Sequence, residues 1–195
     1  MALGAFPQFI QDNYELHEWR HATAVLSQDF SSEYDDIVDV LMRFKLMRSY
    51  INVGGGGKSK VSAWLDGELT KKDWEEKQFK TQIRVDEHVS DSPTHKVDCY
   101  KNGVALEIEW NNKDPFFDRD LNNFRLLFDL RTVSVGVIIT RCDALQNVFQ
   151  SLGRGASYGA STTHMRKLLP RIEGGGGGGC PLLVIGIKPS LYVED

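Results

Sequence analysis

The sequence has few cysteines and no long apolar run. Its 195 residues include three cysteines, Cys99, Cys142 and Cys180. An odd number of widely spaced cysteines argues against a disulfide framework and against a zinc knuckle, so we expect reduced, structural thiols. No apolar stretch approaches the ~20 residues that a membrane-spanning helix needs. The first twenty residues also lack the basic segment and apolar run of a secretory signal. We therefore expect a cytoplasmic protein that does not interact with membranes.

An excess of positive charge is also missing. The net charge of -4 excludes a broad, charge-driven coating of nucleic acid, but it permits a locally basic cleft. Hydrophobic residues make up 41% of the chain and charged residues 26%, as in ordinary globular proteins. The length suits one domain with a substantial core, and no linker divides the chain. We expect a single domain over residues 1–195.

A β-hairpin that carries acids is predicted within residues 95–120, HKVDCYKNGVALEIEWNNKDPFFDRD. Two runs of strand-forming residues, 96–101 and 104–110, flank Asn102-Gly103. That dipeptide is typical of a two-residue type I′ turn, because both positions tolerate a positive φ angle. The turn therefore fixes how the two strands pair.

The pairing sorts the acids onto one face of the hairpin. If Lys101 pairs with Val104, then Asp98 lies opposite Glu107, with Cβ atoms about 5 Å apart. Glu109 shares their face, while the apolar residues at positions 104, 106 and 108 form the core side. We therefore expect Glu107 and Glu109 together at a surface or cleft.

Facing carboxylates repel each other, so something should offset the charge. Mg²⁺ is the simplest candidate, because it prefers oxygen ligands and commonly takes one or two carboxylates. Asp98 and Glu107 are then its candidate ligands. The alternative is a solvated acidic face on which Lys96 forms a cross-strand ion pair with Glu109. The spacing D-x8-E-x-E alone leaves both interpretations open.

Two helices are predicted before the hairpin, over residues 12–28 and 33–50, the second opened by Ser31 or Ser32 as cap. A glycine-rich segment follows at residues 53–59, VGGGGKS. It resembles a phosphate-binding loop, but it lacks the first required glycine and a preceding strand. A flexible loop that leads into a helix is the preferred interpretation, with the helix around residues 60–69.

A strand over residues 78–86 is predicted to join the sheet, because apolar and polar residues alternate there. Glu76 lies just before it. This glutamate is either a further ligand or general base near the acidic hairpin, or a surface residue at a helix end.

The remaining elements predict an α/β fold. A helix over residues 117–131 is apolar around much of its girth, so it needs the sheet and a second subunit as partners, or complete burial in the monomer. The near-continuous apolar runs at 134–140 and 181–187 indicate strands covered on both faces. Helical segments at 141–152 and 160–170 lie between them. The expected architecture is a mixed central sheet flanked by helices.

A loop rich in hydrogen-bond donors spans residues 153–164, GRGASYGASTTH. Arginine can bind guanine or phosphate, and hydroxyl groups can contact phosphates or base edges. A plain connecting loop explains the composition equally well. Lys113 continues the parity of the hairpin acids, but it ranks below Glu109 as a residue of their face, because Asp114-Pro115 should end the strand before Lys113 can point inward. Six consecutive glycines at 174–179 predict a mobile or closely approached loop. The DNA-contact candidates in the donor-rich loop are Arg154, Ser157, Tyr158, Ser161, Thr162 and Thr163.

Three stretches together resemble the BglII/BstYI family of type II restriction endonucleases. They are KVDCYKNGVALEIEWNNKDPFFDRDLNNFR, GRGASYGAST and PLLVIGI, within residues 54–187. The resemblance implies the restriction-endonuclease-like core of the PD-(D/E)xK nuclease superfamily. It also places Asp98 as the first metal-binding aspartate and Glu107 as the second acid. Glu109 stands where the superfamily usually has lysine, so a carboxylate would bind a metal-held water or act as general base.

The resemblance implies a catalytic activity with Asp98, Glu107 and Glu109 at its centre and Glu76 as a further candidate. A Mg²⁺-dependent homodimer would hydrolyse double-stranded DNA at a short palindrome and leave 5′-phosphate and 3′-hydroxyl ends. Two alternatives remain open. One is a repair or recombination nuclease without sequence specificity, and the other is a non-catalytic DNA-binding protein whose acids form a salt-bridged surface.

Overall fold

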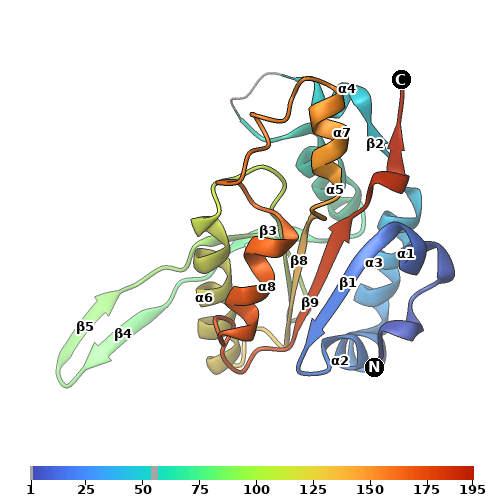
Figure 1. The fold of residues 1–195 in the computed structure, drawn as a ribbon. Coiled ribbons are helices and arrows are strands. Elements are labelled where there is room, and N and C mark those ends of the chain that lie inside the picture. Colours follow the sequence, from blue (N-terminus) through green and yellow to red (C-terminus); the bar gives the residue numbers. More distant parts are fainter. Residues whose placement is uncertain (1, 54–56) are drawn as a thin grey trace.

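A six-stranded mixed sheet forms the centre of the computed structural model, which describes residues 2–53 and 57–195 (Figure 1). Its strands are β1 (Tyr14–Trp19), β3 (Glu75–Gln78), β6 (Lys96–Lys101), β7 (Val104–Ile108), β8 (Val135–Arg141) and β9 (Leu182–Ile187). Their order across the sheet is β1-β9-β8-β7-β6-β3. The central strands β7, β8 and β9 are parallel, whereas β1, β6 and β3 pair antiparallel with their neighbours. The α/β architecture expected from the sequence is confirmed.

Helices cover both faces of the sheet, so the central strands are buried on both sides. One face carries α1 (Gln8–Asn13), α2 (Ala22–Asp29), α3 (Ser31–Arg43) and α5 (Lys60–Thr70), and the other carries α6 (Pro115–Asp129) and α8 (Met165–Glu173). Residues of β8 alternate accordingly: Val137 faces the first group and Ile138 the second. The strands predicted from the two apolar runs are confirmed.

Smaller elements complete the fold. They are the 3₁₀-helices η1 (Ala2–Ala5) and η2 (Pro189–Leu191), the helices α4 (Arg48–Ile51) and α7 (Leu145–Ser151), and the parallel pair β2 (Leu46–Met47) and β10 (Tyr192–Val193). All three cysteines are buried free thiols, as expected. No helix within residues 2–53 and 57–195 is both long and apolar enough to cross a membrane.

The two helices predicted before the hairpin are present as α2 and α3, but their extents were predicted wrongly. Residues Tyr14–Trp19, inside the first predicted helix, form β1, because they add an edge strand to β9. The second predicted helix starts at Ser31, with Phe30 and not a serine at the cap position, and ends at Arg43. The chain then turns extended at Phe44, and Leu46–Met47 pairs with the C-terminal strand. Both errors arise from partners distant in sequence.

The strand predicted over 78–86 is also wrong in extent. The sheet strand β3 ends at Gln78, and the chain continues into a separate hairpin of β4 (Gln82–Val85) and β5 (His88–Asp91). This hairpin projects from the body of the protein (Figure 1). Ile83 and Val85 are 56% and 63% exposed, so their alternation does not mark a buried face.

Both glycine-dependent turns follow from the sequence. Asn102 and Gly103 have φ angles of 48° and 90°, which confirms the type I′ turn, and Lys101 pairs with Val104. The six glycines form a tight turn after α8, in which a Cβ at Gly178 would lie 2.8 Å from the Arg125 side chain of α6. This short distance confirms that another part of the chain approaches the glycine loop closely. In the glycine-rich segment before α5, residues 54–56 lie outside the described residues, and Ser59 caps the helix.

Candidate active site

The acidic hairpin brings Asp98 and Glu107 together at the carboxyl end of β7. The β6–β7 pairing follows the predicted register as far as Cys99 and Leu106. Beyond that pair, hydrogen bonds from backbone amides to side-chain carboxylates take the place of hydrogen bonds between the two backbones. The Asp98 amide donates to Glu107 Oε2 at 3.2 Å, and the Ile108 amide donates to Asp98 Oδ2 at 2.9 Å. The two carboxylates therefore lie side by side, as the register predicts.

The burial of these acids differs from the expectation. Glu107 and Glu109 are each 1% exposed, whereas Asp98 is partly exposed. Helix α6 covers the face of β7 that carries Glu107, and Glu109, just after the strand, is buried as well, so neither is displayed on an open surface. The alternative ion pair between Lys96 and Glu109 is wrong, because Lys96 Nζ contacts Glu76 Oε2 at 2.7 Å.

Helix α6 contributes a cation and a fourth acid to the site. Arg119 Nη2 lies 3.3 Å from Glu109 Oε1, and its Nε donates to Asp120 Oδ1 at 2.8 Å. Asn112 Nδ2 donates to the other Glu109 oxygen at 2.8 Å. Asp120 is 1% exposed. The two ends of the Glu109 carboxylate are thus held in place by side chains from different elements.

Sequence analysis did not include Asp120 among the candidate site residues. A signal was present, because Asp120 lies three residues after Phe117 and four before Phe124. That spacing places it on the apolar stripe of the helix. Both phenylalanines are fully buried. An acid on a buried stripe needs a partner, and here the partners are Arg119 and Glu109.

Burial dominates the electrostatics of the four acids. It raises the pKa of Glu107 well above the usual value, and the charges of Asp120 and Asp98 raise it further. Burial, followed by the charge of Asp120, raises the pKa of Glu109 to about 8. The pKa values of Asp98 and Asp120 are also raised, in each case chiefly by burial. Concentrated carboxylates with raised pKa values are a mark of functional sites.

The donor set fits a hard divalent cation. Glu107 Oε1 and Asp120 Oδ2 are buried and have no hydrogen-bond partner. An unpartnered buried carboxylate oxygen is costly unless a proton or cation binds it. Among the described residues, no three acidic, histidine or cysteine side chains form a ready-made metal cluster. The arrangement therefore suits a cation held by one or two carboxylates, with water and substrate completing its shell.

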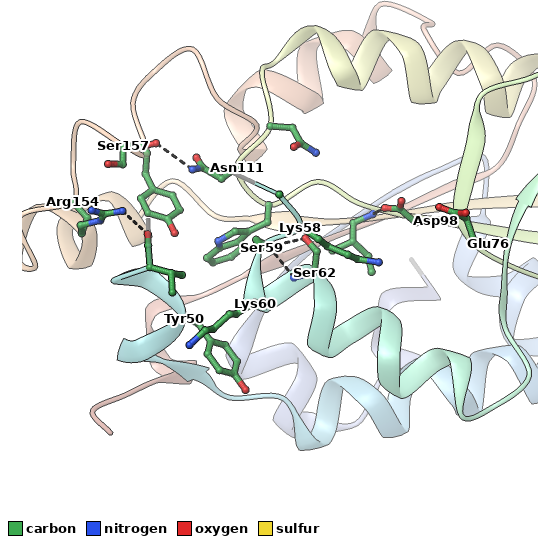
Figure 2. Close-up of a pocket in the computed structure, with 16 residues that line it drawn as sticks. Tyr50, Lys58, Ser59, Lys60, Ser62, Glu76, Asp98, Asn111, Arg154 and Ser157 are labelled. Atoms are coloured by element: carbon green, nitrogen blue, oxygen red, sulfur yellow. Dashed lines mark hydrogen bonds between the residues drawn. The ribbon is translucent and has the colours of Figure 1, made fainter. Parts of the chain in front are cut away.

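A polar cleft of about 670 Å³ opens beside Asp98. Figure 2 shows Asp98 and Glu76 toward one end of it, Arg154 and Ser157 toward the other, and Lys58 between them. Lys60 also lines the cleft. The cleft therefore combines acids at one end with three cationic side chains, within a protein of net negative charge.

Glu76 lies on β3, not at a helix end as one interpretation supposed. Its side chain is 58% exposed and forms the ion pair with Lys96. It shares the cleft with Asp98, but no hydrogen bond joins it to the other acids within the described residues.

The donor-rich loop is fastened to the segment that follows the acids. Lys113 forms an isolated bridge with Thr162, and the Thr163 amide donates to the Asn112 carbonyl at 2.9 Å. Asn111 Nδ2 donates to the Ser157 carbonyl at 3.2 Å. The structure therefore joins the two regions that sequence analysis assigned to catalysis and to DNA contact.

The predicted DNA-contact residues divide into two groups by burial. Ser157, Ser161 and Lys113 are exposed, and Arg154 is partly exposed. Tyr158, Thr162 and Thr163 are at most 8% exposed, so they support the loop from inside.

Arg141, which sequence analysis missed, anchors that support. It is the last residue of β8 and is 1% exposed. Its guanidinium group lies 5.3 Å from the centre of the Phe149 ring and 5.7 Å from that of Tyr158, rings that stack on each other at 4.0 Å. It also donates to Thr162 Oγ1 at 2.6 Å. The sequence signal that could have identified Arg141 is an arginine at the end of an apolar strand.

Comparison with known proteins gives one finding. The model of the family described as "Restriction endonuclease BglII/BglIII" matches residues 14–187. No curated protein matches the chain significantly. The match includes all the acids of the site, the loop and every strand of the central sheet. It confirms the resemblance seen within residues 54–187 and extends it toward the N-terminus.

Proposed function

Because the chain belongs to the BglII/BglIII restriction endonuclease family and is therefore a DNA nuclease, we propose that it is a type II enzyme that cleaves double-stranded DNA at a short palindrome. The proposal includes dependence on Mg²⁺ and products with 5′-phosphate and 3′-hydroxyl ends. The observation that carries it is Asp98, which lines a cleft together with three cations and whose backbone amide donates to the buried Glu107 carboxylate.

Asp98 and Glu107 are the residues that would hold the metal ion. Bound there, Mg²⁺ would supply Lewis-acid chemistry at the scissile phosphate. Glu109 would accept a proton from the attacking water, and Arg119 and Asn112 fix the orientation of its carboxylate. The pKa of Glu109, raised to about 8, makes its ionised carboxylate a stronger base than that of an ordinary glutamate. Glu76 is a more distant candidate because it is exposed and paired with Lys96.

The cleft and the loop would bind the DNA. Arg154 and Ser157 line the cleft, and Ser161 and Lys113 are exposed beside it, so these four residues are the proposed direct contacts. Tyr158, Thr162 and Thr163 would act from below by holding the loop in shape. Lys and Arg contacts to phosphate position a protein on DNA, whereas contacts to base edges select the sequence.

A homodimer would present two such sites to the two halves of a palindrome. Helix α6 supports this proposal. Leu126 and the C-cap residue Leu130, one turn apart, are 41% and 52% exposed. Apolar residues on the opposite side of the helix, such as Leu121 and Phe124, are buried against the sheet. Of the two roles considered for this helix, contact with the sheet and a second subunit fits these exposures better than complete burial.

The first test is digestion of a long, sequenced, unmethylated DNA with the purified protein, in Mg²⁺ and in EDTA, with mapping of the product ends. We expect discrete fragments in Mg²⁺ alone, with 5′-phosphate ends. A metal-dependent smear would instead indicate a nuclease without sequence specificity. Intact DNA under varied metal ions would contradict the proposed activity.

The second test changes the two proposed metal ligands. Asp98→Asn and Glu107→Gln should each reduce cleavage by at least about 100-fold, because each removes charge from the cation site. DNA binding measured in EDTA should stay close to that of the unchanged protein, and circular dichroism should show the same fold. Unchanged cleavage by both variants would refute the assignment of the active site.

A further inference from the structure

Lys58 is a cation of the cleft that the proposed mechanism does not use. It immediately precedes Ser59, the N-cap of α5, and its side chain is 49% exposed to the cleft and solvent. Its Nζ lies 2.5 Å from Asp66 Oδ2. Asp66 lies almost two turns along the same helix, so the ion pair folds the lysine side chain back along α5.

Asp66 in turn connects the helix to the catalytic strand. Cys99 Sγ, on the residue that follows Asp98, lies 3.5 Å from Asp66 Oδ1 and donates to it. One carboxylate thus contacts both Lys58 and the strand that carries Asp98. The position of the Lys58 ammonium group relative to Asp98 is therefore constrained through a short series of side-chain contacts.

Two other cations near the acids and the loop are placed differently. Arg154 Nη2 donates to the Val53 carbonyl at 2.7 Å, near the end of the cleft away from Asp98. Arg119 lies behind the acids and is held by Glu109 and Asp120. The charges of Lys58 and Arg119 both partly oppose the effect of burial on the pKa of Asp98, but of these two cations it is Lys58 that lines the cleft.

The charge of the substrate favours a cation at this place. A phosphodiester entering beside Asp98 brings its own negative charge toward four carboxyl groups. Glu109, at the position where the superfamily usually has lysine, supplies no cation. Charge also develops on the phosphoryl oxygens as the reaction proceeds, and fixed cations aimed at it lower the barrier. A lysine on the facing wall of the cleft can meet that need.

We propose that Lys58 binds the scissile phosphate and stabilises its transition state, and that Asp66 is the positioning residue that holds Lys58 for this task. The inference rests on the proposed nuclease function. In the reaction the water oxygen bonds to phosphorus, the bond from phosphorus to the 3′-oxygen breaks, and the leaving oxygen takes up a proton. Lys58 stays protonated and donates hydrogen bonds to a non-bridging phosphoryl oxygen.

The protonation state of Lys58 is consistent with this role. Burial alone would lower the pKa of its ammonium group, but the hydrogen bond and ion pair with Asp66 raise it above the usual value. A phosphate that enters the cleft can share the ammonium group, because lysine has three donor hydrogens. Asp66 need not release the lysine for the phosphate to bind.

The test compares Lys58→Ala, Lys58→Arg, Asp66→Asn and the Lys58→Ala/Asp66→Asn double variant. Lys45→Ala is the matched control, because Lys45 is an exposed lysine that follows α3 and does not line the cleft. Single-turnover cleavage is measured in Mg²⁺ at saturating DNA, and DNA affinity is measured separately in EDTA. Thermal unfolding verifies that each variant is folded.

Lys58→Ala should slow cleavage by roughly 100-fold while weakening binding only a few-fold, and Lys58→Arg should restore most of the rate. Asp66→Asn should slow cleavage less than Lys58→Ala and add almost nothing in the double variant, because a positioning residue acts through its partner. Losses that multiply would show that Asp66 acts independently, and would overturn its positioning role.

Two outcomes would overturn the role of Lys58 itself. One is cleavage by Lys58→Ala at the rate of Lys45→Ala, and the other is a loss confined to affinity. Either result, with an active unchanged protein, refutes this inference and leaves the proposed nuclease function standing. An unchanged protein that cleaves no DNA refutes both.

Discussion

The buried carboxyl group of Glu109 makes the stability of the fold depend on pH. Its carboxyl group is 1% exposed, and its pKa is raised from 4.5 to about 8, first by burial and then by the charge of Asp120. A group whose folded-state pKa is raised contributes most to stability below its unfolded pKa. That contribution is lost as the pH rises from about 4.5 toward 8. The raised pKa values of Glu107, Asp98 and Asp120 act in the same direction.

We therefore expect the metal-free protein to be less stable at pH 8 than at pH 5.5. The loss should approach about 1.4 kcal/mol per pH unit for each proton released. Urea unfolding in EDTA at a series of pH values measures it. Glu109→Gln removes one titrating group, so its profile should be flatter. Stability of the unchanged protein that rises steadily between pH 5.5 and 8 would contradict the assigned protonation states.

The sequence predicts the identity of the main acids better than their surroundings. Asn102-Gly103 and strand alternation suffice to bring Asp98 and Glu107 together, because both are local features. The burial of Glu107 and Glu109 depends on α6, which packs over them only in the folded protein. The roles of Asp120 and Arg141 depend on tertiary packing in the same way. Charge patterns alone therefore describe the ligands but not their electrostatics.

At the scale of elements, two glycines within regular structure illustrate opposite roles. Gly136 in β8 lies where α6 crosses the sheet, and a Cβ there would come within 2.7 Å of the Phe124 ring and 2.8 Å of Leu182. Gly67 lies inside α5, and a Cβ there would meet no atom within 4 Å. The first glycine is needed for packing, whereas the second only weakens its helix.

Gly136→Ala should lower the free energy of unfolding by about 1–3 kcal/mol, because the core cannot accommodate the extra methyl group without strain. Gly67→Ala should raise it by about 0.5–1 kcal/mol through a better helix propensity. Chemical denaturation of both variants at one pH, in EDTA, compares them directly. Equal changes in the free energy of unfolding for the two variants would show that α6 does not pack against β8 as described.

The elements themselves were predictable where their signal is local. The paired apolar runs gave β8 and β9, and turn chemistry gave the β6–β7 hairpin. Residues Tyr14–Trp19 were misjudged because their strand conformation depends on β9, more than 160 residues later. The alternation in residues 78–86 was misleading for the opposite reason. It belongs to the projecting β4–β5 hairpin, which has no core beneath it within the described residues.

At the scale of the whole molecule, the proposed dimer would make α6 a link between cleavage and assembly. The helix carries Arg119 and Asp120 on the side that faces the acids and Leu126 and Leu130 on a side that is partly exposed. If that exposed side meets a second copy, as proposed, dimer formation and the geometry of the active site share one rigid element. Two sites then face the two strands of one palindrome.

The double variant Leu126→Glu/Leu130→Glu should therefore be a folded monomer, since it places charge in the proposed interface and removes nothing from the core. Light scattering coupled to size-exclusion chromatography gives the mass, and thermal unfolding gives the stability. We expect double-strand cleavage to fall at least about tenfold, with nicked DNA accumulating. Met42→Glu is the control, because Met42 on α3 is also 41% exposed but lies on the opposite side of the sheet. A dimer that survives the double variant and fails with Met42→Glu would move the interface away from α6.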